Sequence, residues 1–325
     1  MTLSADIALE LGSFQLAARI TAPGDGITVL FGPSGSGKST ILSILAGLRR
    51  ADRGEIRIGH HAIDELPPHR RGIGIVFQDA RLFPHLSVRQ NIAYAWKRAP
   101  EKRRPDIEAV ASFFDIAAHL DRPVTNLSGG EKSRVALARA VAAAPDFLLL
   151  DEPFAALDGT RRRAFIQVLT NMHRNYHLPM MAVTHNIDDA AALATHLVAL
   201  KEGRVVAQGA FADASRAPEF QALLDKADIG TAMPASSLRS SHGGQSLWLR
   251  ADQVLLASEE PRAVSARNVL AGEVSAVIAE SEQSRLVELT TGSGIVLSRV
   301  TPEAVRDLSL TPGKKAWALA KAHAL

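Results

Sequence analysis

The sequence predicts an α/β protein in which helices cover both faces of a parallel β-sheet, with a small β-rich domain after it. Three short apolar runs, at residues 27–31, 147–150 and 180–183, are typical of strands buried on both faces. Helix-like stretches separate these runs, and that alternation favours a parallel sheet. Beyond residue 245, short alternating segments separated by Gly, Pro and Ser indicate the β-rich domain.

The α/β part is predicted to contain a strand, a glycine-rich turn, a helix and a helical insertion, followed by a linker. The strand at 27–31 ends at a glycine-rich turn, and STILSILAGL, residues 39–48, predicts the helix after it. Residues 85–145 are mostly helix-like, and prolines separate the helix-like segments, so we expect a helical insertion there. Residues 229–245 are rich in Ser, Gly and Ala and are interpreted as a loop or linker.

Composition limits what the protein does. The chain has 325 residues, enough for two domains, and 46% of them are hydrophobic, so each domain can bury a core. A formal net charge of +3, 5% aromatic residues and the lack of a long basic run argue against a nucleic-acid partner. The chain contains no Cys, which excludes disulfides and thiolate metal sites and favours a reducing compartment.

The N-terminus and the apolar runs bear on membrane association. MTLSADIALELGS lacks the basic and apolar regions of a secretory signal. No apolar run approaches the roughly 18 residues that a membrane span needs. We therefore expect a soluble protein that reaches a membrane only through a partner.

A glycine-rich loop lies between the first buried strand and its helix. GPSGSGKST, residues 32–40, fits the pattern G-x-x-x-x-G-K-Ser/Thr, in which backbone N–H groups and a helix N-terminus surround phosphate oxygens. Lys38 can reach the β- and γ-phosphates of a nucleotide, and the Ser39 hydroxyl can coordinate Mg²⁺. The predicted nucleotide-binding residues of this loop are Gly32, Pro33, Ser34, Gly35, Ser36, Gly37, Lys38, Ser39 and Thr40.

Two carboxylates follow the buried run FLLL at residues 147–150. Asp151 can hold Mg²⁺ through water, and Glu152 can polarise an attacking water molecule. Two acids after an apolar strand are weak evidence alone, because many strands end that way. Together with the glycine-rich loop they predict nucleotide hydrolysis.

The stretch LSGGEKSRVALARA, residues 127–140, predicts an amphipathic helix. Ser128 is its N-cap, and Glu131 three residues later completes a capping box. A further hypothesis is that this N-terminus faces a nucleotide phosphate. Because a helical insertion separates it from the loop at 32–40, a nucleotide bound to a second copy of the chain fits better.

These motifs, in this order, resemble those of the ATP-binding subunits of ABC transporters over about residues 1–225. GPSGSGKST looks like the Walker A loop, FLLLDE like Walker B and LSGG like the ABC signature. The resemblance implies a P-loop NTPase fold, the ABC cassette, with a helical subdomain at about residues 85–145. It also implies that Gln78 is the Q-loop glutamine, His185 the switch histidine at the γ-phosphate and Phe14 the aromatic residue that stacks on adenine.

The resemblance further implies a head-to-tail homodimer. ATP and Mg²⁺ would be bound at the interface of the two copies. One copy would contribute the glycine-rich loop, the Mg²⁺ ligands and the catalytic residues, and the other would contribute the signature. Opening and closing of the dimer at the cytoplasmic face of the membrane would drive a permease. A periplasmic or surface solute-binding protein would deliver the solute to that permease. The residues concerned are Lys38, Glu152 and His185 for catalysis, Ser39, Gln78 and Asp151 for Mg²⁺, and Ser128 and Gly130 from the second copy.

Two positions depart from the family pattern. The usual Gln of the signature is Glu131, and the usual Ser of the D-loop (AALD, residues 155–158) is Ala155 or Ala156. A carboxylate near a γ-phosphate is repelled by it. Folding of Glu131 back onto the Ser128 amide would keep the carboxylate away, so we interpret Glu131 as structural.

Two stretches bear on the cargo. Residues 66–99, with LPPHRR and ARLFPHLSVRQN, resemble molybdate importer ATPases, although importers of other small ions share much of this segment. SARNVLAGEV (265–274) and residues 297–325 resemble a molybdenum-pterin-binding (Mop) domain. The Mop domain is a small five-stranded barrel of the OB type. In that family the domains associate and bind molybdate or tungstate where they meet.

An oxyanion pocket needs N–H donors, a hydroxyl and a cation. Ser265, Arg267 and Asn268 can supply donors, and Lys321 can supply charge. By the resemblance, Ser265 and Lys321 are the best candidates. A hypothesis that follows is feedback, in which molybdate or tungstate bound there restrains the ATPase.

The predicted domains are therefore an ABC domain at residues 1–228, a linker with a connecting β segment at 229–263 and an oxyanion-binding domain at 264–325. Alternatives stay open. One is an importer ATPase for sulfate or another small solute with a purely structural tail. Another is a soluble ABC ATPase outside transport, although such proteins usually carry two cassettes or a long coiled coil. A third is an oxyanion-storage protein, which the intact catalytic set argues against.

Overall fold

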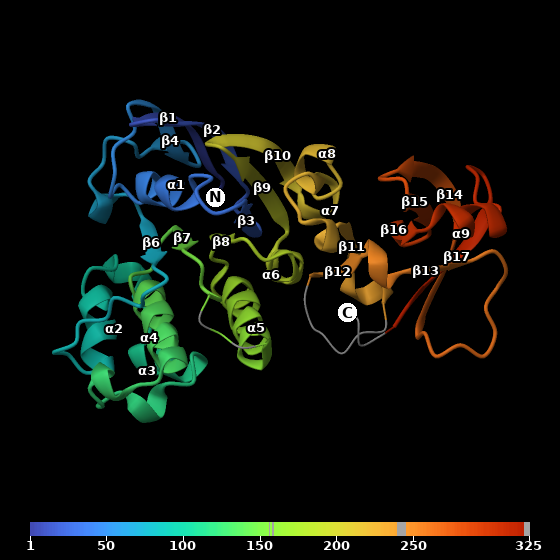
Figure 1. The fold of residues 1–325 in the computed structure, drawn as a ribbon. Helices are drawn as coiled ribbons and strands as arrows, with labels where there is room; N and C mark the ends of the chain where they lie inside the picture. Colours follow the sequence, from blue (N-terminus) through green and yellow to red (C-terminus); the bar gives the residue numbers. More distant parts are fainter. Residues whose placement is uncertain (156, 158, 239–244, 322–325) are drawn as a thin grey trace. The chain divides into compact units, whose positions relative to one another are not determined.

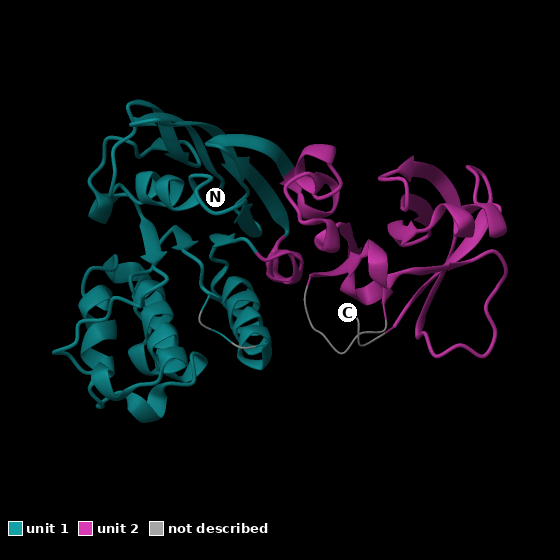
Figure 2. Ribbon diagram, in the orientation of Figure 1, with its two compact units in different colours: residues 1–185, 195–208 teal, residues 186–194, 209–325 magenta. Residues whose placement is uncertain are grey.

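The computed structural model describes residues 1–155, 157, 159–238 and 245–321. The chain divides into two compact units (Figure 2). The first comprises Met1–His185 and Thr195–Gln208, and the second comprises Asn186–Ala194 and Gly209–Leu325.

A ten-stranded sheet forms the first unit's core (Figure 1). Five of its strands, from β9 through β3, β8 and β7 to β6, run parallel, as predicted. Every residue of β3, β7 and β8 is buried, which explains their unbroken apolar sequences. In spatial order the strands are β5 (His61–Ala62), β4 (Arg53–Ile58), β1 (Leu3–Leu11), β2 (Phe14–Ala22), β10 (Arg204–Ala210), β9 (His196–Lys201), β3 (Ile27–Phe31), β8 (Met180–Thr184), β7 (Phe147–Leu150) and β6 (Ile73–Val76).

The sheet is not wholly parallel, and here the sequence-based prediction was incomplete. Strands β1, β2, β4 and β5 pair antiparallel. Buried and less buried residues alternate along β1, in the sequence LSADIALEL, and along β2. This period of two is typical of a half-buried strand, so the signal for the antiparallel arm was present in the sequence.

The helices of the first unit are α1 (Lys38–Leu45), α2 (Val88–Trp96), α3 (Ile107–Phe113), α4 (Gly129–Ala142) and α5 (Gly159–Tyr176). Helices α2, α3 and α4 pack on one another between β6 and β7 in the sequence, in agreement with the predicted helical insertion (Figure 1). Helix α1 is shorter than predicted, because Gly47 adopts a left-handed φ of 76° that a helix cannot continue through.

The second unit contains a two-stranded and a five-stranded sheet, both antiparallel. The five strands agree with the predicted small β domain, and apolar side chains from all five pack in one cluster. The two-stranded sheet consists of β11 (Gly230–Pro234) and β12 (Ser246–Arg250). The five-stranded sheet has the spatial order β13 (Leu255–Ala257), β17 (Lys315–Ala320), β14 (Asn268–Ala279), β15 (Arg285–Thr291) and β16 (Gly294–Val300). The helices of this unit are α6 (Ile187–Leu193), α7 (Phe211–Ala214), α8 (Pro218–Gln221) and α9 (Pro302–Asp307).

Strand β11 corrects the interpretation of residues 229–245 as a loop. Its residues pair with β12, and Ala232 and Met233 are buried. The composition of the segment is dominated by the Ser- and Gly-rich residues after the strand. A strand of five residues whose burial comes from a long-range partner leaves little local signal.

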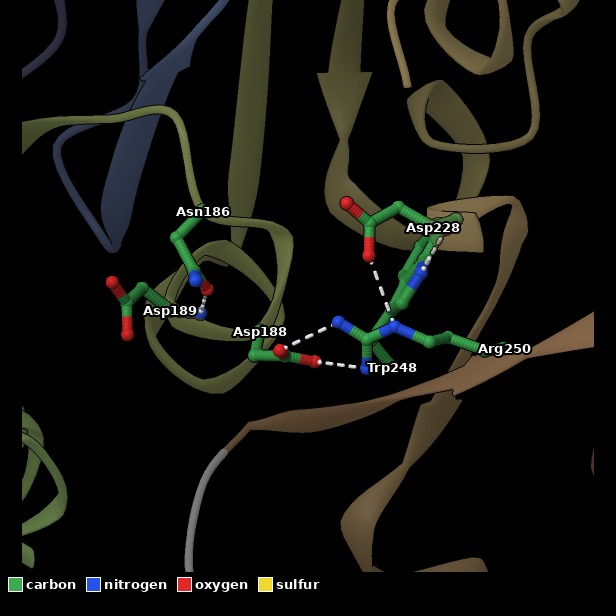
Figure 3. Close-up of polar contacts among 6 residues, drawn as sticks. All are labelled: Asn186, Asp188, Asp189, Asp228, Trp248 and Arg250. Carbon is green, nitrogen blue, oxygen red and sulfur yellow. Dashed lines mark hydrogen bonds and ion pairs between the residues drawn. The ribbon is translucent and has the colours of Figure 1, made fainter. Parts of the chain in front are cut away.

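Helix α6 belongs to the second unit although the first unit's chain continues after it, because α6 packs against β12. Arg250 on β12 donates to both carboxylate oxygens of Asp188 on α6, at 3.0 and 2.8 Å, and through Nε to Asp228 at 3.0 Å (Figure 3). Trp248 Nε1 donates to the Asp228 carbonyl at 2.8 Å. Polar contacts between residues far apart in the sequence therefore assemble this part of the second unit.

We expect Arg250→Ala to lower the free energy of unfolding by about 1–2 kcal/mol, because it removes a mostly buried guanidinium that bonds to two carboxylates. Urea unfolding followed by tryptophan fluorescence would measure the loss. The matched control is Arg19→Ala, since the Arg19–Asp6 ion pair is exposed and such pairs contribute about 0.5 kcal/mol. Equal losses for the two variants would contradict the importance of the Arg250 contacts.

Candidate functional site

The residues of the predicted nucleotide site follow parallel strands at one edge of the sheet. Gly32, Asp151 and His185 come directly after β3, β7 and β8. The last residues of β3 and β8 are paired, and so are the last residues of β6 and β7. Gln78 is exposed, two residues beyond the end of β6. Because the carboxyl ends of parallel strands share an edge, the topology gathers these four positions.

The glycine-rich loop has a backbone that requires glycine. Gly35 and Gly37 have φ values of 80° and 104°, in the left-handed region. A Cβ on Gly37 would also lie 2.9 Å from the Phe14 ring, so the half-buried Phe14 packs directly beside the loop. The Ser36 hydroxyl is buried and has no hydrogen-bond partner in the described part of the chain. A curled loop with an unpaired hydroxyl fits a phosphate group.

Lys38 is buried at the start of α1 and points into the loop. Its Nζ donates to the carbonyls of Gly32 at 2.7 Å and Pro33 at 2.8 Å. Burial lowers the pKa of Lys38, and the neighbouring carboxylates of Glu152 and Asp151 oppose this. The loop thus holds a cation inside it, where the phosphates of a nucleotide would pass.

Ser39 and Asp151 form the second element of the site. The Ser39 hydroxyl donates to Asp151 Oδ1 at 3.2 Å. Burial raises the pKa of Asp151, and Glu152 adds to the rise, whereas the Ser39 hydrogen bond and Lys38 lower it. A hydroxyl and a carboxylate side by side are oxygen ligands of the kind that Mg²⁺ takes, so these residues fit the predicted ion.

Glu152 and His185 form the third element. His185 Nδ1 lies 3.6 Å from Glu152 Oε1, and the imidazole is more exposed than the carboxylate. Glu152 has a φ of 44°, a strained value for a residue with a side chain. Such strain persists where surrounding structure holds it, often at functional sites. A carboxylate and an imidazole at this edge can activate a water molecule.

The predicted capping box at the start of α4 is confirmed. Ser128 N donates to Glu131 Oε2 at 2.7 Å, and Glu131 N donates to the Ser128 hydroxyl at 3.4 Å. The hydrogen bonds with Ser128, and then the nearby His119 and Arg122, lower the pKa of Glu131. His119 Nε2 lies 3.0 Å from Glu131 Oε1, a contact that the sequence analysis missed because the two residues lie twelve positions apart.

The first turn of α4 is open to a ligand but separate from the glycine-rich loop. Apart from its chain neighbours and the backbone of its own helix, no heavy atom lies within 4 Å of a Cβ built on Gly130. Among the described residues, no hydrogen bond or ion pair joins this turn to residues 32–40. Of the predicted D-loop, Ala156 and Asp158 lie outside the described residues.

The predicted oxyanion residues are only partly brought together. Ser265 and Lys321 line one cleft of about 450 Å³ in the second unit. Arg267 is exposed beside the cleft lining, and Asn268 is buried in β14, opposite Ala320 of β17. The residues that line the cleft are Gln253, Leu255, Val264, Ser265, Ala266, Leu319 and Lys321.

Comparison with known proteins covers both parts of the chain. Residues 18–155 match the ABC transporter family, and residues 264–325 match the TOBE domain. The Molybdenum import ATP-binding protein ModC of Rhizobium etli is 34% identical, and the alignment covers 100% of this chain and 99% of that protein. The protein of the same name from Methylococcus capsulatus is 35% identical over 98% of this chain and 97% of its own length. The chain belongs to the family of ABC transporter ATP-binding proteins.

Solved structures share this ABC cassette fold. A dimeric ATP-binding cassette in a post-hydrolysis state with ADP and Pi has a TM-score of 0.57 and 25% identity, and covers 65% of this chain and 98% of its own. A bacterial Atm1-family ABC exporter with ATP bound has a TM-score of 0.57 and 27% identity, and covers 66% of this chain and 39% of its own. In the described part of this ABC protein, no helix is both long and apolar enough to span a bilayer.

The capping role of Glu131 predicts a pH-dependent stability. Because its hydrogen bonds lower the pKa of Glu131 in the folded state, the stabilisation is present above the ordinary value of 4.5 and is lost as the pH falls through the lower folded value. We expect Glu131→Ala to cost about 1 kcal/mol at pH 7, and less as the pH falls below the ordinary value.

Thermal unfolding followed by circular dichroism at a series of pH values would measure this difference. The matched control is Glu282→Ala, since Glu282 is an exposed residue in the turn between β14 and β15. If the loss of unfolding free energy caused by Glu131→Ala stayed constant across acidic pH, the capping role would be contradicted.

Proposed function

We propose that this protein is the ATP-hydrolysing subunit of an ABC importer for molybdate. The geometry that supports hydrolysis is the convergence of Lys38, the Ser39–Asp151 pair and the Glu152–His185 pair at one sheet edge. The cargo is supported by relatives named as molybdenum importers, which are similar over the full length, TOBE domain included.

In this proposal the loop at 32–40 binds the triphosphate of ATP. Backbone N–H groups between Ser34 and Thr40, and the hydroxyls of Ser34 and Ser36, would face phosphate oxygens. Lys38 would exchange its two carbonyl partners for oxygens of the β- and γ-phosphates. Phe14, which already packs against Gly37, would stack on the adenine.

Ser39, Gln78 and Asp151 would hold Mg²⁺, which when bound neutralises charge on the β- and γ-phosphates. Glu152 would orient a water molecule and accept its proton as the water oxygen attacks the γ-phosphorus. His185 would donate a hydrogen bond to the γ-phosphate. The bond to the leaving ADP oxygen breaks, and phosphate and ADP result.

The protein would work as a homodimer, with Ser128 and Gly130 of a second copy facing the γ-phosphate. The open first turn of α4, separate from the chain's own loop, supports this arrangement. The dimer would bind membrane permease subunits at the cytoplasmic face, and a solute-binding protein would supply the permease. ATP-driven closing and opening of the dimer would then move the cargo across the membrane.

The roles of Lys38 and Glu152 separate binding from hydrolysis. We expect Glu152→Gln to reduce ATP turnover at least about a hundredfold while leaving ATP affinity intact, because only the proton acceptor is lost. Lys38→Ala should instead weaken ATP binding, because the phosphates lose their cation. Phosphate release and equilibrium binding of ATP would test both variants. Turnover that survives Glu152→Gln would contradict the assignment of the base.

The cleft of the second unit is proposed to bind molybdate or tungstate and so restrain ATP hydrolysis. Ser265 would offer a hydroxyl and Lys321 a cation to the dianion, and both line the cleft. Arg267 and Asn268 would contribute only after rearrangement, since neither lines the cleft. The proposal is therefore centred on Ser265 and Lys321.

Calorimetric titration of the full chain with molybdate, tungstate and sulfate would test this cleft. We expect molybdate and tungstate to bind, and Lys321→Ala to weaken their binding about tenfold because a charge-assisted hydrogen bond is lost. The same variant should relieve any slowing of the assembled transporter's ATPase by molybdate. Lys315→Ala is the matched control, since Lys315 is an exposed lysine at the start of β17, the strand that ends one residue before Lys321. Equal affinity of the Lys321→Ala and Lys315→Ala variants for molybdate and tungstate would contradict oxyanion binding in the cleft.

A further inference from the structure

Glu131 places a negative charge at the start of α4, where the family usually has a neutral glutamine. Both of its carboxylate oxygens have partners. Oε2 accepts from Ser128 N at 2.7 Å, and Oε1 lies 3.0 Å from His119 Nε2. The carboxylate is therefore held from two sides, by the backbone of its own helix and by an imidazole from the preceding 3₁₀ turn, Ala117–His119.

His119 is itself well placed for this contact. Its backbone N–H donates to Ile116 O at 2.9 Å, and its carbonyl accepts from Arg122 N at 2.9 Å. The side chain is 21% exposed, and Nδ1 is buried with no hydrogen-bond partner in the described part of the chain. Among the described residues, Glu131 is thus the one polar partner of the ring. Arg122 acts on the Glu131 carboxylate more weakly than His119 does.

We propose that His119 is a positioning residue for nucleotide binding between two copies of the chain. By holding Glu131 against the Ser128 amide, His119 turns the carboxylate away from the phosphates that the second copy brings to this turn. Without His119, the Ser128 amide alone holds the carboxylate. The side chain then leaves that position more readily towards those phosphates, where like charges repel. This inference rests on the homodimer of the proposed function.

The proposal predicts that His119 matters only while residue 131 is charged. The test uses full-length chain carrying Glu152→Gln, so that ATP is bound but turned over slowly. ATP-dependent dimer formation is followed by sedimentation velocity. We expect His119→Ala to raise the ATP concentration at half-maximal dimer about three- to tenfold, the range expected for loss of one charged contact.

Glu131→Gln should leave that concentration unchanged, because a glutamine also completes the capping box and carries no charge. His119→Ala added to Glu131→Gln should have no further effect. His119→Gln, which keeps a side-chain N–H donor, should restore part of the wild-type behaviour. His60→Ala, at an exposed histidine in the turn between β4 and β5, is the matched control.

Binding of a fluorescent ATP analogue to dilute, monomeric protein separates this inference from the function on which it rests. The inference is supported if monomeric protein binds the ATP analogue equally well in every His119 variant. The ATP concentration at half-maximal dimer must then rise only when residue 131 is glutamate. The inference is overturned if His119→Ala raises the ATP concentration at half-maximal dimer equally with and without the Glu131→Gln substitution, or raises it in neither case. Failure of the Glu152→Gln protein to bind ATP or to dimerise overturns the proposed homodimer, and the inference with it.

Discussion

The register of four parallel strands is the constraint on which the proposed nucleotide site depends. Strands β6, β7, β8 and β3 end at one edge of the sheet, and each is followed directly or within two residues by a site residue. Strands β3, β7 and β8 are buried along their whole length, so a shift in register would unpair backbone groups that no water could reach. Strand β6 lies at the edge of the sheet and is held in register by its ladder with β7. Residues more than a hundred positions apart, such as Ser39 and Asp151, therefore meet at hydrogen-bonding distance.

Charge is concentrated at that edge and balanced only in part. The buried Lys38 faces the carboxylates of Asp151 and Glu152, yet burial still lowers the pKa of Lys38 and raises that of Asp151. Both shifts disfavour the charged forms of groups that a phosphate and a divalent cation would stabilise. The site is thus organised around charges that a ligand would complete, and the unpaired Ser36 hydroxyl in the same loop fits that view.

At the start of α4 the opposite arrangement holds, because the carboxylate there already has its partners. Glu131 is engaged by Ser128 and His119. In the second unit, Arg250 is likewise saturated by Asp188 and Asp228, and these bonds attach α6 to β12. Fully paired groups stabilise an arrangement, whereas partly paired ones are available for binding. This contrast distinguishes Glu131 and Arg250, whose pairing supports the fold, from Lys38 and Ser36, which are proposed to meet a ligand.

The sequence by itself determined the curled glycine-rich loop, the buried strands, the capped helix α4 and the family, because each has a local pattern with a direct physical meaning. Glycines at left-handed positions, unbroken apolar runs and the Ser128–Glu131 spacing need no distant partner to be recognised. Only the tertiary structure decided that β11 is a strand, that α6 belongs with the second unit and that His119 contacts Glu131. It also decided that Ser265 and Lys321 line one cleft while Arg267 and Asn268 do not. These features depend on contacts between residues far apart in the chain, which no local pattern encodes.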